Sequence, residues 1–133
     1  MSHNVDCNTA MVGKTVKEIR GGKGYDTTML FIMTDGSAYG FHHDQACCEC
    51  VAINDVCGDL ADLLGSPLLQ AEETSSTDRP EDVSPPEYEP ESQTWTFYKF
   101  ATINGGVTIR WFGESNGYYS ESVTMTEFAP GVR

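Results

Sequence analysis

The sequence predicts an α+β fold in which two antiparallel β-meanders flank one short central helix, with a mobile acidic loop before the second meander. Three observations support this. Apolar and polar residues alternate around turn dipeptides, three leucines recur at helical spacing, and one acidic stretch nearly lacks apolar residues. The 133 residues are enough for one hydrophobic core, so residues 1–133 are expected to form a single domain.

Residues 13–72 are expected to hold the first meander and the helix. A first strand is predicted near 13–20, after which "GGKG" turns the chain. The apolar run "TTMLFIM" suits a covered strand, and "TDGS" contains the Asp-Gly signal of a tight hairpin. The third strand, "AYGFHH", places Tyr39 and Phe41 on one face and Gly40 and His42 on the other.

The helix prediction depends on Leu60, Leu63 and Leu64, which are three or four residues apart. Asp55 or Asp59 is suited to cap its N-terminus. The sequence Gly-Ser-Pro at 65–67 should end the helix, because proline disfavours the helical region for its predecessor. A short strand around Val51 and Ile53 precedes the helix, and "LLQAEE" follows it as a strand.

Residues 73–93 are predicted to be a mobile acidic loop. The stretch from Glu72 to Glu91 has eight carboxylates against one base, Arg79, and carries −7 of the formal net charge of −12. It is also rich in Ser, Thr and Pro. Such a segment buries too little apolar surface to offset the entropy lost on ordering. The acidity of the chain is therefore mainly a property of this loop.

Residues 94–128 are expected to form the second meander from "TWTFYKFATI", "GVTIRWFGES" and "YYSESVTMTEF". The joining segments "NGG" and "SNG" are hairpin signals. Alternation places Trp95, Phe97 and Lys99 on one face, and Thr96, Tyr98 and Phe100 on the other. "GESNG" also matches the G-x-S-x-G motif of hydrolases. Because a strand pattern follows it and all histidines lie upstream, we interpret it as a turn.

The stretch "HHDQACCECV" raises the question of a metal or thiol site. A zinc site would use His42, His43, Cys47, Cys48, Cys50 and Cys57, but the cysteines are adjacent or one residue apart instead of in the usual spaced pairs. The alternatives are a disulfide, a catalytic cysteine with a histidine base, or small cysteines packed beneath a strand and helix. The last is favoured, and no cofactor is expected.

Arg110 is the strongest candidate for ligand binding. A charge in the middle of the apolar run "TIRWF" must be paired or face a ligand, and Lys99 occupies a similar position. If the hairpin turns near 104–105, the two cations lie opposite each other among aromatic residues, which suits phosphate or nucleobase recognition. The candidate ligand-binding residues are Arg110, Lys99, Trp95, Trp111 and Asn116. The alternative is that carboxylates such as Glu121 or Asp44 pair with the cations.

Composition excludes several partners. The chain has no apolar run long enough to span a membrane and its first residues, "MSHNVDC", lack a signal-peptide core, so a cytoplasmic protein with reduced cysteines is expected. Direct binding to nucleic acid is not expected, since there is no basic surface to release counterions.

Several motifs resemble a family of small, largely uncharacterised cytosolic proteins encoded by bacteriophages and prophages. They are H-D-Q-x-C-C-E, D-x-C-G-D-L, G-S-P, TWTFYK and R-W-x-G-E-S-N-G-Y-Y-S-E. The resemblance covers most of the chain except its first dozen residues, the acidic loop and the tail. Cys50 follows the H-D-Q-x-C-C-E motif and adds a third thiol to its two, which slightly increases the capacity to bind a metal. The resemblance implies a genomic setting and a location in the cytoplasm of an infected bacterium, and it identifies no catalytic residue.

The leading functional hypothesis is a phage-encoded, non-catalytic binding protein that acts on the host, as an inhibitor of antiviral defence. It would bind a host protein through its carboxylates, or sequester a small nucleotide signal in a pocket at Arg110, lined by several copies if the protein is a homo-oligomer. The alternatives are a zinc- or thiol-dependent protein centred on residues 42–57, and a virion-associated structural protein.

Overall fold

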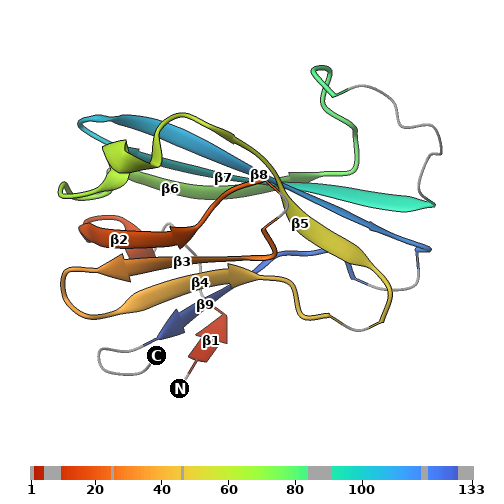
Figure 1. The fold of residues 1–133 in the computed structure, drawn as a ribbon, viewed down its shortest axis with the longest axis horizontal. Coiled ribbons are helices and arrows are strands. Elements are labelled where there is room, and N and C mark those ends of the chain that lie inside the picture. Colours follow the sequence, from red (N-terminus) through yellow and green to blue (C-terminus); the bar gives the residue numbers. More distant parts are fainter. Residues whose placement is uncertain are drawn as a thin grey trace.

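The structure, a computed structural model, describes residues 2–4, 10–24, 26–45, 47–83, 91–117 and 120–128. It is almost entirely β, so the α+β prediction with a central helix is wrong. Two antiparallel sheets pack face to face (Figure 1). Within the described part of the chain, no helix has the length and apolar character needed to cross a membrane.

One sheet has five strands in the order β1-β9-β4-β3-β2, and the other has four in the order β5-β8-β7-β6. The bounds of the five-stranded sheet are β1 Ser2–Asn4, β9 Thr124–Phe128, β4 Ala38–His42, β3 Thr28–Met33 and β2 Val16–Gly21. The bounds of the four-stranded sheet are β5 Cys50–Cys57, β8 Gly105–Ser115, β7 Ser92–Thr102 and β6 Gln70–Ser76. The chain crosses from the five-stranded to the four-stranded sheet after β4, and it crosses back after β8.

The first meander, β2-β3-β4, is confirmed as three neighbouring antiparallel strands. The Asp-Gly turn is present, and Gly36 has a φ of 92°, a conformation that other residues adopt at a cost. Hydrogen bonds from the hydroxyl and the N–H of Ser37, assisted by Lys14, hold the pKa of the Asp35 carboxyl at about 2. This turn thus combines a local backbone signal with a side-chain cap.

The predicted helix is one 3-10 turn, Leu60–Leu63 (η1). Asp59 caps it by accepting a hydrogen bond from the N–H of Ala61, as one of the two predicted caps. Leu63 is fully buried while Leu64 is exposed, so the leucine spacing reflects one packing contact and not a helical stripe. So short a segment cannot offset the cost of helix nucleation. The next residues instead form isolated bridges at the start of β2, from Leu64 to Val16 and from Pro67 to Thr15, the residue before that strand.

The prediction of a second meander is only half correct. β7 and β8 form the predicted hairpin, but β9 leaves their sheet and pairs with β4 and β1. The Ser-Asn-Gly turn therefore begins a crossover between sheets. Gly113 allows this crossover to pack closely, because a Cβ there would lie 2.7 Å from the Glu121 carbonyl oxygen.

The acidic loop is shorter than predicted. Residues 73–76 belong to β6 and residues 92–93 to β7, both paired along their length. The connection therefore spans 77–91, of which 84–90 lie outside the described residues. Glu72 and Glu73 stand on a strand, so part of the charge assigned to a loop is carried by the sheet.

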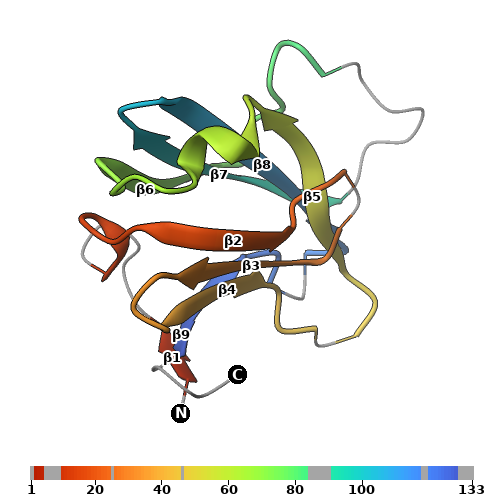
Figure 2. The same cartoon turned by 60° about the vertical axis from the view of Figure 1, so that its left-hand side comes forward.

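The core lies between the sheets (Figure 2). Phe100 contacts Phe31 and Phe41 of the opposite sheet, with ring centroids 4.9 Å and 5.9 Å apart. Tyr98 meets Phe41 edge to face at 4.8 Å. The faces predicted for β4 and β7 are thereby confirmed. This aromatic cluster joins the two sheets.

Candidate functional site

Arg110 lies on the outer face of the four-stranded sheet, and its guanidinium group is already bound by side chains. Its Nε donates to the Asn54 Oδ1 at 2.8 Å, and its Nη1 lies 3.1 Å from both Asp82 carboxylate oxygens. The Asp55 carboxylate is 3.9 Å from Nη2. The guanidinium carbon stands 5.6 Å from the centre of the Trp95 ring. The carboxylate pairing predicted as the alternative is therefore correct in kind, with Asp82 in place of Glu121 or Asp44.

A β-bulge in β5 explains this arrangement. The register shifts between Ile53 and Asp55, so Asn54 is an extra residue opposite the β8 strand. Asn54 and Asp55 thus both reach Arg110, which pairs with Asp55 in the ladder. Sequence alternation alone would have placed one of them in the core.

The predicted ligand-binding residues are only partly brought together. The hairpin turns at Ile103-Asn104, one residue earlier than predicted, so Arg110 is opposite Phe97 and Lys99 is opposite Thr108. Lys99 and Trp95 still share the outer face with Arg110. Trp111 points into the core and is buried. Asn116 lies six residues beyond Arg110, or about 20 Å along an extended chain. A pocket formed by all five residues is therefore not present.

Hollows lined by described residues open on the outer faces of both sheets. One of about 160 Å³ lies beside Phe112 and Asn54, and it is smaller than the roughly 300 Å³ at which ligand pockets begin. Another, of about 470 Å³, lies over Gly40 on the five-stranded sheet and is mostly apolar. Its basic side chains already contact carboxylates, Arg20 with Glu18 and His42 with Asp44. Neither hollow presents a cation aimed at an anionic ligand.

The six residues of the zinc alternative are dispersed. His42 contacts Asp44, His43 contacts Glu49, and the sulfur atoms of Cys47 and Cys48 contact each other. Cys50 and Cys57 lie at opposite ends of β5, on the order of 20 Å apart. Over the described residues, no group of three or more His, Cys, Asp or Glu side chains is placed to hold a metal ion.

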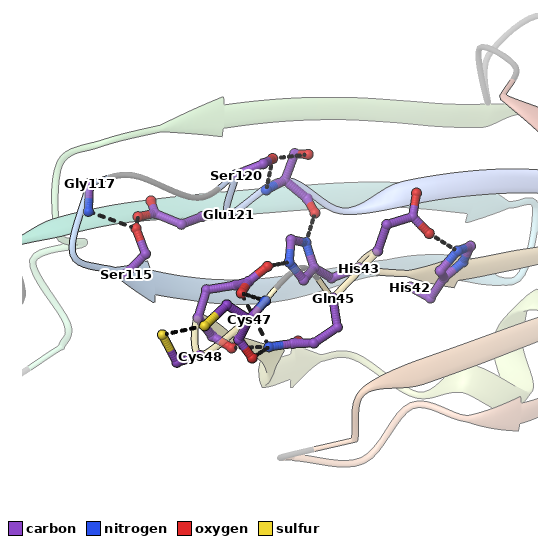
Figure 3. A network of polar contacts seen from close by, with 12 residues as sticks. His42, His43, Gln45, Cys47, Cys48, Ser115, Gly117, Ser120 and Glu121 are labelled. Carbon is purple, nitrogen blue, oxygen red and sulfur yellow. Dashed lines mark hydrogen bonds and ion pairs between the residues drawn. The ribbon is translucent and has the colours of Figure 1, made fainter.

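Sequence reasoning missed a buried polar network that joins the β4–β5 and β8–β9 connections (Figure 3). The His43 ring lies 2.7 Å from the Ser122 carbonyl oxygen through Nδ1 and 2.7 Å from Glu49 through Nε2. Both side chains are almost fully buried. A carbonyl oxygen only accepts, so Nδ1 carries a proton, and a second proton lies between Nε2 and the Glu49 carboxyl group. The pair therefore acts as a polar clamp between two chain crossings.

Glu121 forms a second buried contact in the same region. Its carboxylate accepts hydrogen bonds from Thr94, at 2.8 Å, and from Ser115. The Ser115 oxygen in turn accepts from the Gly117 N–H at 3.0 Å. Since both nitrogens of His43 are committed elsewhere, Ser115 is not aligned with that histidine as a nucleophile would be with its base. The interpretation of "GESNG" as a turn agrees with these contacts.

Asp82→Asn is expected to loosen the segment over Arg110 with little effect on global stability. The Asp82 side chain is 67% exposed, so the pair contributes under about 1 kcal/mol. Cleavage after Glu81 by a glutamate-specific protease should become several-fold faster, while the urea midpoint hardly moves. Asp55→Asn is the control, since its carboxylate is farther from the guanidinium group. Equal cleavage rates in both variants would contradict the idea that the Asp82–Arg110 ion pair holds this segment in place.

Comparison with known proteins adds a family assignment. No curated protein and no solved structure matches the chain. Residues 9–125 match the family model described as "Domain of unknown function (DUF7448)", a range that includes β2 to β8, the Arg110 contacts and the His43–Glu49 clamp. The chain therefore belongs to the DUF7448 family.

Proposed function

We propose that the protein is a non-catalytic binding protein that docks an acidic face on a basic surface of a partner protein. The acidic face is the outer side of the four-stranded sheet together with the segment 77–83 that reaches Arg110. Its six carboxylates are Asp55, Glu72, Asp78, Glu81, Asp82 and Glu114. Its three bases are Arg79, Lys99 and Arg110.

The observation that carries this proposal is the occupied guanidinium of Arg110. With Asp82 and Asn54 on its donors, the strongest cation of this face is neutralised from within the chain. The four carboxylates of this face that do not contact Arg110 outnumber its two remaining bases, Arg79 and Lys99, so the face stays net negative. A net negative face attracts a surface of opposite charge and speeds association. The same contacts weaken the nucleotide-sequestering hypothesis, which requires Arg110 to be open.

The setting of a bacteriophage protein that acts on its host is part of this proposal. Its support is the resemblance of the five motifs to small phage and prophage proteins. An acidic inhibitor of this kind would occupy the basic surface with which a host protein of antiviral defence binds its own ligand. Fold alone does not imply function, so the proposal depends on the charged face.

The double variant Glu72→Gln, Glu81→Gln tests the acidic face and leaves the Arg110 contacts intact. Protein captured from a bacterial lysate should have a basic surface, and its association rate with the purified chain should fall with added salt. The double variant should associate on the order of tenfold more slowly. The control Glu18→Gln, Asp44→Asn removes the same charge away from this face and should associate at the wild-type rate.

The readout in cells is phage plating on hosts that carry antiviral defence. Expression of the wild-type chain should raise plating efficiency on at least one such host, and the acidic-face variant should not. If the acidic-face variant binds and protects as well as the wild type, the proposed surface is wrong.

A further inference from the structure

Cys47 and Cys48 form an exposed pair of sulfur atoms at the tip of the β4–β5 connection. Their Sγ atoms lie 3.0 Å apart, and both residues are exposed (Figure 3). Neither forms a disulfide. Adjacent side chains on an extended strand point to opposite faces, so the turn is what brings the two sulfurs to one side.

The turn is anchored on the buried clamp. The Cys47 N–H donates to the Glu49 carboxyl group at 2.8 Å, and the Gln45 side-chain amide donates to the Cys47 carbonyl oxygen at 3.1 Å. Glu49 is itself fixed by His43. The backbone of Cys47 is therefore held on both sides, and the two exposed cysteines project from this anchored turn.

The geometry is unfavourable for a disulfide and for zinc. Adjacent Cα atoms are about 3.8 Å apart, below the roughly 4.4 Å that disulfides need, so a bond between the sulfurs would be strained. Two sulfurs at about 2.3 Å from a tetrahedral zinc ion would lie roughly 3.8 Å apart. Zinc also requires loss of the thiol protons, and the hydrogen bond to Cys47 raises the pKa of Cys48.

We propose that Cys47 and Cys48 form a chelating site for a trivalent thiophilic metalloid, of which arsenic(III) is the probe. A trivalent centre of this class holds its substituents at nearly right angles, which brings two sulfurs closer together than a tetrahedral ion does. With an organoarsenic oxide, two arsenic–sulfur bonds form and the arsenic–oxygen bond breaks. The two thiol protons leave with that oxygen as water, and no atom changes oxidation state.

The test uses the full chain, one equivalent of phenylarsine oxide, and intact mass spectrometry. One adduct is expected to survive excess glutathione, a monothiol, and to be lost to dithiothreitol, which chelates arsenic itself. Cys47→Ser and Cys48→Ser should each lose the adduct in glutathione. Cys57→Ser, which removes an exposed cysteine at the far end of β5, should retain it. No adduct on the wild type, or an equally stable adduct on Cys48→Ser, would overturn the site.

A second variant separates the folded site from two cysteines that are merely adjacent in sequence. Gln45→Ala removes the hydrogen bonds to the Cys47 carbonyl, the Glu49 carbonyl and the Glu49 carboxyl group, and leaves both thiols in place. Loss of such a supporting contact typically weakens a chelate site by about tenfold or more, so release into dithiothreitol should accelerate by about that factor. Gln70→Ala, a half-buried glutamine on β6 in the other sheet, is the control. Release at the wild-type rate from Gln45→Ala would show that the turn does not preorganise the thiols.

Discussion

Glu49→Ala is expected to lower the free energy of unfolding by about 3–5 kcal/mol, because it leaves several buried hydrogen-bonding groups without their acceptor at a cost of about 1–3 kcal/mol each. The Glu49 side chain is fully buried and accepts hydrogen bonds from the Cys47 N–H and the Gln45 amide as well as contacting His43. Removing it leaves those groups without this acceptor in the interior, where an unsatisfied polar group is costly. Urea denaturation followed by circular dichroism measures the loss, which is large against the 5–15 kcal/mol typical of a domain.

Glu49→Gln is the matched control for this prediction. The glutamine oxygen can accept from the Cys47 N–H, and its amide can donate to Nε2 of a neutral His43. Most of the network is then kept, and a loss under about 1.5 kcal/mol is expected. Should the alanine and glutamine variants unfold at the same urea concentration, the clamp would be a minor contributor and the two connections would be held by packing alone.

Phe100→Ala is expected to destabilise the protein by about 3–5 kcal/mol, because a large side chain is lost from a close-packed core. Phe100 is 1% exposed and contacts Phe31 and Phe41 from the opposite sheet. The cavity would lie between the sheets, so both should loosen together. Hydrogen exchange should show faster exchange in β3 and β4 as well as in β7.

Phe97→Ala provides the comparison on the same strand. Phe97 is half-buried on the outer face, three residues away, and its removal leaves no cavity between the sheets. A loss of about 1 kcal/mol or less is expected, with no change in exchange on β3 and β4. If the two phenylalanine variants were equally unstable, the division of β7 into an inner and an outer face would be incorrect.

The sequence by itself determined the local features of this protein. Alternation predicted the faces of β4 and β7, the Asp-Gly dipeptide predicted the turn at Gly36, and Asp59 was among the predicted caps. Each of these features depends on interactions between residues that are close in the chain, so it can be predicted from the local sequence. The need of Arg110 for a partner was also predictable, because an unpaired charge in an apolar strand is costly.

Only the tertiary structure decided which elements meet. Leucines at helical spacing form a 3-10 turn because Leu63 packs into the core while Leu64 bridges to β2. The strand after the Asn-Gly signal joins the other sheet, since a turn signal does not specify which edge a strand pairs with. Arg110 meets Asn54 across the bulge in β5 and Asp82 from the β6–β7 connection, and His43 meets the Ser122 carbonyl oxygen from the β8–β9 crossover, all through contacts distant in sequence. Such pairings depend on the whole sandwich, so spacing along the chain could not reveal them.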